Sequence, residues 1–169
     1  MPDTDERGLD RFNRPRRKGN PSLTSPDSVS SSRDTPGTVS EANVAIVRAS
    51  YDAYLRGDLE AALLAIDPAI EIHDHDIPDA REYRGLDGMF AWQADWERSW
   101  ESWRWDPEDY IDAGEQVVAI LRVYAKGRGS GVDVERVDGA VWTLSAGKCV
   151  RLDYYGSRDE ALNAAGLQQ

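Results

Sequence analysis

Residues 116–126 read QVVAILRVYAK, a run of β-branched and apolar side chains that is long enough for a central strand. Glycine-containing turns follow at residues 127–131 (GRGSG) and 145–147 (SAG). Two further strand-like segments, residues 132–144 and 148–155, lie between and after these turns, and residues 110–114 end another strand upstream. Strands joined by such short turns predict an antiparallel meander.

Helices are predicted before and after this meander in the sequence. Thr38 and Glu41 have capping-box spacing, so a helix is expected to begin there and to end at Gly57. A second, shorter helix is expected over residues 59–66, and a last one after Ser157.

The clearest helical periodicity lies between residues 87 and 103. Five apolar side chains there fall within about 80° of arc at 100° per residue. They are Met89, Trp92, Trp96, Trp100 and Trp103. This stripe is expected to pack on the sheet, and one or two of its indoles can also line an apolar ligand cavity. Residues 78–88 are expected to form a loop.

Residues 69–76 read AIEIHDHD and alternate as a β-strand does. One face would carry Ile70, Ile72, Asp74 and Asp76, and the other Glu71, His73 and His75. A carboxylate at the mouth of an apolar cavity has its charged form desolvated, which raises its pKa and suits a general base. Asp74 is thus a candidate base, with the capping of the following loop as the alternative.

The two histidines need a separate interpretation. Their spacing can chelate a metal, but a catalytic zinc site needs a third ligand, and the chain has no further histidine. A carboxylate could supply that ligand in an acidic protein, yet we favour a histidine pair on the outer sheet face, at a dimer contact. We therefore expect no metal and no cofactor.

Composition restricts the classes of partner. The net charge is −11, and residues 39–169 hold 25 Asp/Glu against 13 Lys/Arg. Such a domain repels phosphate backbones, which argues against nucleic acid and anionic membranes.

Residues 1–38 are rich in Pro, Ser and charged residues, so we expect a disordered tail before one domain at 39–169. Without a signal-like or membrane-spanning apolar run, the expected location is the cytoplasm, and a lone cysteine, Cys149, excludes an internal disulfide.

Several segments together resemble the SnoaL-like branch of the NTF2-like superfamily. They are residues 54–60 (YLRGDLE), Asp67-Pro68, residues 72–74 (IHD), residues 83–85 (YRG) with Gly88, residues 112–114 (DAG), 130–132 (SGV) and 141–148 (VWTLSAGK), and the ending 161–167 (ALNAAGL). The resemblance covers about residues 40–167. It implies an α+β cone, a curved antiparallel sheet wrapped on helices in the order α-α-β-α-β-β-β-β-α, with a deep pocket and usually a homodimer.

The resemblance also implies site residues. Asp74 is similar in position to the proton-shuttling Asp of the ketosteroid isomerases. A shift of one residue would place His73 there instead, but strand parity favours Asp74. The second acid of the isomerases and polyketide cyclases falls at Ala140 here, and Asp138 lies two residues earlier on the same strand face. Arg122 would pair Asp138 or Asp74, as in the epoxide hydrolases, with a surface ion pair as the alternative.

The expected function follows from both lines of reasoning. We expect a protein that binds a small hydrophobic molecule in an apolar, Trp-rich pocket, with cofactor-free isomerase, cyclase or hydrolase chemistry at Asp74, Asp138 and Arg122. The alternative is a non-catalytic ligand-binding or dimerisation module. The expected substrate-binding residues are Tyr51, Tyr54, Asp76, Trp92, Trp96 and Trp142.

Overall fold

The computed structural model describes residues 38–78 and 81–167. The tail expected at residues 1–38 lies outside the described residues, apart from Thr38. Within the described ranges, no helix is both long enough and apolar enough to cross a membrane.

The helices begin where the capping residues predict. The Thr38 hydroxyl accepts from the Glu41 amide at 3.2 Å and opens α1 (Val39–Leu55). The Asp58 carboxylate accepts from the Ala61 amide at 3.1 Å and opens α2 (Leu59–Leu63). Helix α4 (Arg158–Ala164) is capped in the same way by Ser157.

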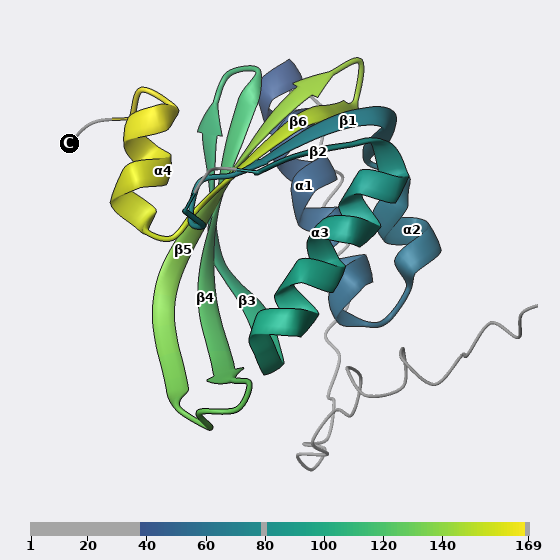
Figure 1. The fold of residues 1–169 in the computed structure, drawn as a ribbon. Helices are drawn as coiled ribbons and strands as arrows, with labels where there is room; N and C mark the ends of the chain where they lie inside the picture. The colour runs from purple at the N-terminus through teal and green to yellow at the C-terminus, as the bar shows by residue number, and fades with distance from the viewer. Residues whose placement is uncertain (1–37, 79–80, 168–169) are drawn as a thin grey trace, which may run out of the picture.

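Six strands form one curved sheet in the order β2-β1-β6-β5-β4-β3 (Figure 1). Their bounds are β1 (Ile66–Asp74), β2 (Arg81–Arg84), β3 (Trp100–Ala113), β4 (Gln116–Gly127), β5 (Asp133–Ser145) and β6 (Lys148–Tyr155). Strands β1 and β6 are parallel, whereas the other neighbours are antiparallel. The predicted meander is therefore confirmed as β3 to β6.

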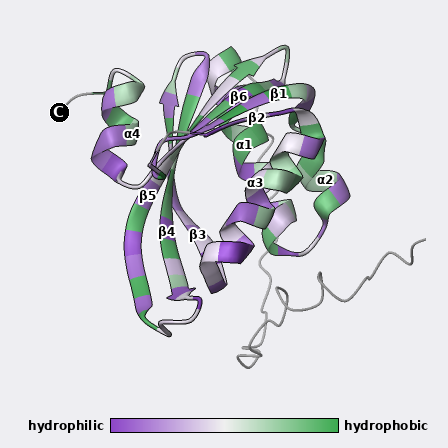
Figure 2. Ribbon diagram, viewed as in Figure 1, coloured by the Kyte–Doolittle hydropathy of each residue, from purple (hydrophilic) through white to green (hydrophobic). Residues whose placement is uncertain are grey.

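Helices cover both faces of this sheet. Helices α1, α2 and α3 (Gly85–Ser99) lie on the concave face, and α4 lies on the opposite, convex face (Figure 1). Along β4, Val117, Leu121 and Val123 belong to the main core under the first three helices, while Val118 and Ile120 pack beneath α4. Hydrophobic and hydrophilic residues mix along β4 and β5 (Figure 2), as expected for strands that reach past the helices into solvent.

The predicted parity of the first strand is also confirmed. Ile70, Ile72 and Asp74 are at most 1 % exposed and face the concave side. His73 lies on the opposite face, where it contacts Glu71 and Glu82.

Three boundaries differ from the prediction. The second helix, expected over residues 59–66, ends at Leu63, and Ile66 begins β1. Residues 81–84, expected in a loop, form the edge strand β2, in which only Tyr83 is buried. A four-residue strand with a single buried side chain has too little alternation to be recognised. The residues expected at the end of the long helix belong to β3 instead, because α3 stops at Ser99.

Trp100 and Trp103 thus leave the predicted helical stripe. Trp103 and Trp105 occupy alternate positions of β3 and both contact the core from the concave side. Aromatic residues favour strands, and a spacing of three or four residues fits a helix by coincidence here. Pro107 lies within the same strand, which is tolerated because β3 is an edge strand with an irregular register between Pro107 and Asp109.

Candidate functional site: an aromatic cavity backed by buried carboxylates

A cavity of about 110 Å³ lies between the concave face of the sheet and helices α1 to α3. Seven aromatic side chains contribute to its lining. They are Tyr51 and Tyr54 from α1, Phe90 and Trp92 from α3, Trp105 from β3, Trp142 from β5 and Tyr154 from β6. Most of the remaining lining is aliphatic, and among the described residues it includes no Asp, Glu, Lys, Arg or His.

The predicted binding residues divide into two groups. Tyr51, Tyr54, Trp92 and Trp142 line the cavity as expected. Trp96 is buried outside the lining, in ring contact with Trp103, Trp105 and Tyr154, and Asp76 lies outside it in an ion pair. Phe90, which is not part of the predicted stripe, was missed, and so were Trp105 and Tyr154. The alternation of Trp103 with Trp105, and of Leu152 with Tyr154, is the signal that points to them.

All three indoles in the lining donate their N–H groups. Trp92 Nε1 donates to Asp74 Oδ2 at 2.7 Å. Trp105 Nε1 donates to the Tyr154 hydroxyl and Trp142 Nε1 to the Tyr51 hydroxyl, each at 3.2 Å. The cavity therefore meets the rings of these indoles, and their polar N–H groups are already bonded.

Asp74 is 1 % exposed and lies outside the lining, where it accepts the hydrogen bond from Trp92. Its second oxygen, Oδ1, accepts from the Asp76 amide at 3.0 Å. Burial raises the pKa of the Asp74 carboxyl, while the hydrogen bonds from Trp92 and the Asp76 amide act in the opposite direction. The loop-capping contact that the sequence left open is thus present together with the bond from Trp92.

Asp138 is the second buried carboxylate and is completely shielded from solvent. Tyr154 donates its hydroxyl to Asp138 Oδ2, and Arg136 Nη2 donates to the same oxygen at 2.9 Å. Arg136 Nε lies 2.8 Å from Oδ1 in an ion pair without hydrogen-bond geometry. Burial raises the pKa of Asp138, opposed by Tyr154 and Arg136. Burial and the neighbouring Asp138 raise the pKa of the Tyr154 hydroxyl well above its usual value.

Arg136 connects Asp138 to the protein surface. Its guanidinium also binds Asp76, through Nη1 at 3.3 Å and through Nη2. Asp76 packs over Gly156, where a Cβ atom would clash with the carboxylate. Arg136 was not predicted, although it lies two residues from Asp138 and so shares its strand face.

Arg122 does not pair with Asp138 or Asp74. It lies between Leu121 and Val123 on β4, so its side chain points to the opposite, convex face. There it binds Glu108 Oε1 at 2.5 Å and Glu135 Oε1 at 3.0 Å. The surface ion pair is therefore the correct interpretation, and Arg136 occupies the place expected for Arg122.

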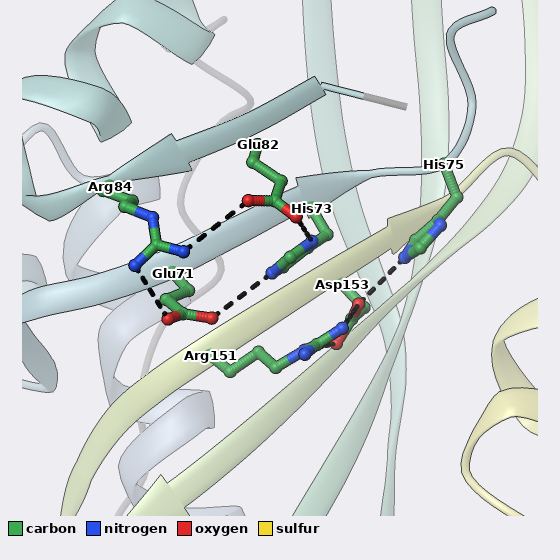
Figure 3. A network of polar contacts seen from close by, with 7 residues as sticks. All are labelled: Glu71, His73, His75, Glu82, Arg84, Arg151 and Asp153. Carbon is green, nitrogen blue, oxygen red and sulfur yellow. Dashed lines mark hydrogen bonds and ion pairs between the residues drawn. The ribbon is translucent and has the colours of Figure 1, made fainter. Parts of the chain in front are cut away.

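The histidines lie on the outer face of the sheet, as expected (Figure 3). His73 lies between Glu71, 3.5 Å from Nε2, and Glu82, 3.6 Å from Nδ1. His75 Nε2 lies 2.8 Å from Asp153 Oδ1, which also binds Arg151. In the described part of the chain, no group of three or more His, Cys, Asp or Glu residues is arranged to hold a metal ion.

Comparisons with known proteins agree with this fold. One similar structure is an NTF2-like protein from Burkholderia thailandensis, with 27% identity, 75% of this chain and 97% of that chain covered, and a TM-score of 0.61. A protein from Jannaschia assigned as a SnoaL-like polyketide cyclase has 18% identity, coverage of 80% and 99%, and a TM-score of 0.60. A ketosteroid isomerase-like protein from Catenulispora acidiphila, in complex with trimethylamine, has 17% identity, coverage of 73% and 93%, and a TM-score of 0.56.

A search of curated proteins found no match. The family model of the SnoaL-like domain, however, matches residues 47–152, which is more than half of the chain and includes α1 to β6 in part or in full. The chain therefore belongs to the SnoaL-like domain family.

Proposed function

We propose that this protein binds a small, largely apolar molecule in the aromatic cavity. The observation that carries the proposal is the lining itself: seven aromatic side chains surround a space of about 110 Å³. Concave apolar sites with few polar groups are the usual form of a small-molecule site. The similar structure from C. acidiphila contains trimethylamine, which supports a ligand of few heavy atoms.

The volume limits the size of the ligand. A cavity of roughly 150 Å³ accepts benzene, and the cavity here is smaller, at about 110 Å³. This space therefore suits a ligand about the size of a single ring or a short branched chain, and because the pocket is partly open, part of a larger ligand would lie outside it.

Tyr51 supplies the polar contact that would orient the ligand. Its oxygen accepts from Trp142, and its hydroxyl proton has no acceptor among the described residues. Burial raises the pKa of Tyr51 well above its usual value, so the hydroxyl stays protonated at neutral pH and can donate. A ligand with one acceptor oxygen would satisfy this donor.

Titration with cyclohexanone, which carries such an oxygen, tests the proposal. We expect saturable quenching of tryptophan fluorescence, weakened roughly 5-fold in Tyr51→Phe because one hydrogen bond is lost. Ala62→Leu should abolish binding, since Ala62 lines the cavity. Ala42→Leu makes the same change at an exposed site of α1 and is the matched control. Equal binding to the Ala62→Leu and Ala42→Leu proteins would refute the cavity as the site.

A second candidate is proton transfer by Asp74, favoured because burial raises its pKa and because its partner Trp92 lines the cavity. In this structure both oxygens accept hydrogen bonds, one of them from Trp92, and Asp74 is not part of the cavity lining. Catalysis would therefore require Trp92 to move. Deuterium exchange at the α-carbons of bound cyclohexanone, faster with the wild-type protein than with Asp74→Asn, is the expected sign of this chemistry, and equal rates would exclude it.

A further inference from the structure

We propose that the ligand of the aromatic cavity is a small organic cation, a substituted ammonium group. This inference rests on the proposed function, because it specifies the chemical class of the molecule that the cavity binds. Three features carry it: the ring surfaces of the lining, the carboxylates behind two of these rings, and the absence of any basic side chain from the lining as described.

The first feature is the packing of the rings around the cavity. Trp92, Trp105 and Tyr154 contact one another with centroid distances of 5.6 to 6.3 Å, and Tyr51 lies 5.4 Å from Trp142. These rings come from α1, α3 and three strands, so they enclose the space from several sides. The face of an aromatic ring carries negative potential and attracts a cation placed within about 6 Å of its centroid.

The second feature is the direction of the indole N–H groups. The edge of an indole is positive and would repel a cation. Each N–H in the lining instead donates to an acceptor of the protein, namely Asp74, the Tyr154 hydroxyl or the Tyr51 hydroxyl. No indole N–H of the lining as described is therefore left unbonded to repel a cation in the cavity.

The third feature is the charge behind the rings. Asp74 accepts from Trp92, and Asp138 accepts from Tyr154, so each carboxylate polarises a ring of the lining through a hydrogen bond. With Asp76 there are three carboxylates, and the only basic group bonded to any of them among the described residues is Arg136. The potential in this region is consequently suited to a positive ligand.

Size and hydration restrict the kind of cation. The volume of about 110 Å³ suits a trimethylammonium group. An apolar lining cannot replace the hydration shell of a bare ammonium or metal ion, whereas alkyl groups on the nitrogen fill the cavity and bury apolar surface. The expected ligand is thus an alkylated amine or a quaternary ammonium compound.

Choline and neohexyl alcohol test the charge directly. The two molecules have nearly the same shape and both carry a hydroxyl group, but carbon replaces the charged nitrogen in neohexyl alcohol. Calorimetric titration of the wild-type protein should give choline roughly 10-fold tighter binding. Equal or tighter binding of neohexyl alcohol would refute the proposal that the ligand is a cation, but it would be consistent with the proposed binding of a small apolar molecule. Binding of neither compound, together with no binding of cyclohexanone, would refute both.

Asp74→Asn tests the contribution of the carboxylate. Asparagine keeps an acceptor for Trp92 Nε1 and removes the charge, so choline should bind roughly 3-fold more weakly while neohexyl alcohol is unaffected. Asp87→Asn changes the net charge equally at an exposed site of α3 and is the matched control. Equal losses of choline affinity in the two variants would show that general surface charge, and not Asp74, is responsible. The comparison of choline with neohexyl alcohol uses the wild-type protein, so it tests the proposal even if Asp74→Asn folds poorly.

Discussion

Replacing Arg136 by methionine should destabilise the protein strongly, and by an amount that depends on pH. The guanidinium binds Asp138, which is completely buried, and Asp76, which is partly exposed. Without it, Asp138 keeps only the hydroxyl of Tyr154 as a donor among the described residues. Removing one partner of a buried ion pair costs about 3–5 kcal/mol, because the remaining charge is left uncompensated.

The pH dependence follows from the ability of Asp138 to take up a proton. Protonation becomes easier by about 1.4 kcal/mol for each unit by which the pH falls, which limits the cost of losing Arg136. Burial already raises the pKa of Asp138, and removing Arg136 raises it further because the opposing contact is lost. We therefore expect a loss of about 3–5 kcal/mol at pH 7.5 that becomes smaller toward pH 5.

Urea unfolding followed by circular dichroism at both pH values measures these free energies. Arg122→Met is the matched control, since Arg122 also binds two carboxylates but on the outer face. Exposed ion pairs contribute about 0–1 kcal/mol, so the control should lose little and show little dependence on pH. A loss in Arg136→Met no larger than in the control, or one as large at pH 5 as at pH 7.5, would refute the reasoning.

Three further predictions concern other contacts. The raised pKa of Asp74 means that the folded state binds the proton more tightly than the unfolded state. Lowering the pH through the folded pKa toward the unfolded value should therefore raise the free energy of unfolding, and Asp74→Asn should reduce this gain. Burial raises the pKa of the Cys149 thiol to about 12, so a disulfide reagent at pH 8 should react only after unfolding, and fast reaction of the native protein would contradict its burial. The homodimer expected from the family predicts twice the chain mass of 18.8 kDa in light scattering, and the single-chain mass would exclude it.

The arrangement of the sheet was largely predictable because its signals are local. Capping residues such as Thr38 and Ser157 satisfy amide groups within three residues, so they act in the same way in any fold. The alternation of Ile70, Ile72 and Asp74 requires only that one face of the strand be buried. The position of β2 was not predictable, because this four-residue strand has one buried side chain and is fixed by its pairing with Glu71 to Asp74 of β1.

The site was harder to predict than the fold. Strand parity placed Asp74 and Asp138 on the concave face, and that placement is confirmed. Parity cannot tell which of two arginines on neighbouring strands meets a given acid, and choosing between Arg122 and Arg136 requires the face of each strand to be known. Assigning the faces of β4 would have placed the Arg122 side chain on the convex face, because its neighbours Leu121 and Val123 are both apolar.

The burial of Asp74 and Asp138 needs an explanation beyond stability. A buried ionic group is often replaced by apolar residues with no loss, or with a gain, in the free energy of unfolding. Here two carboxylates and one guanidinium occupy space beside a core of aromatic rings that could have been filled by leucine or phenylalanine. Each carboxylate bonds a ring that lines the cavity, and neither lies in the lining itself. Their position is therefore explained best by the potential that they impose on the cavity, which is the property that a charged ligand would detect.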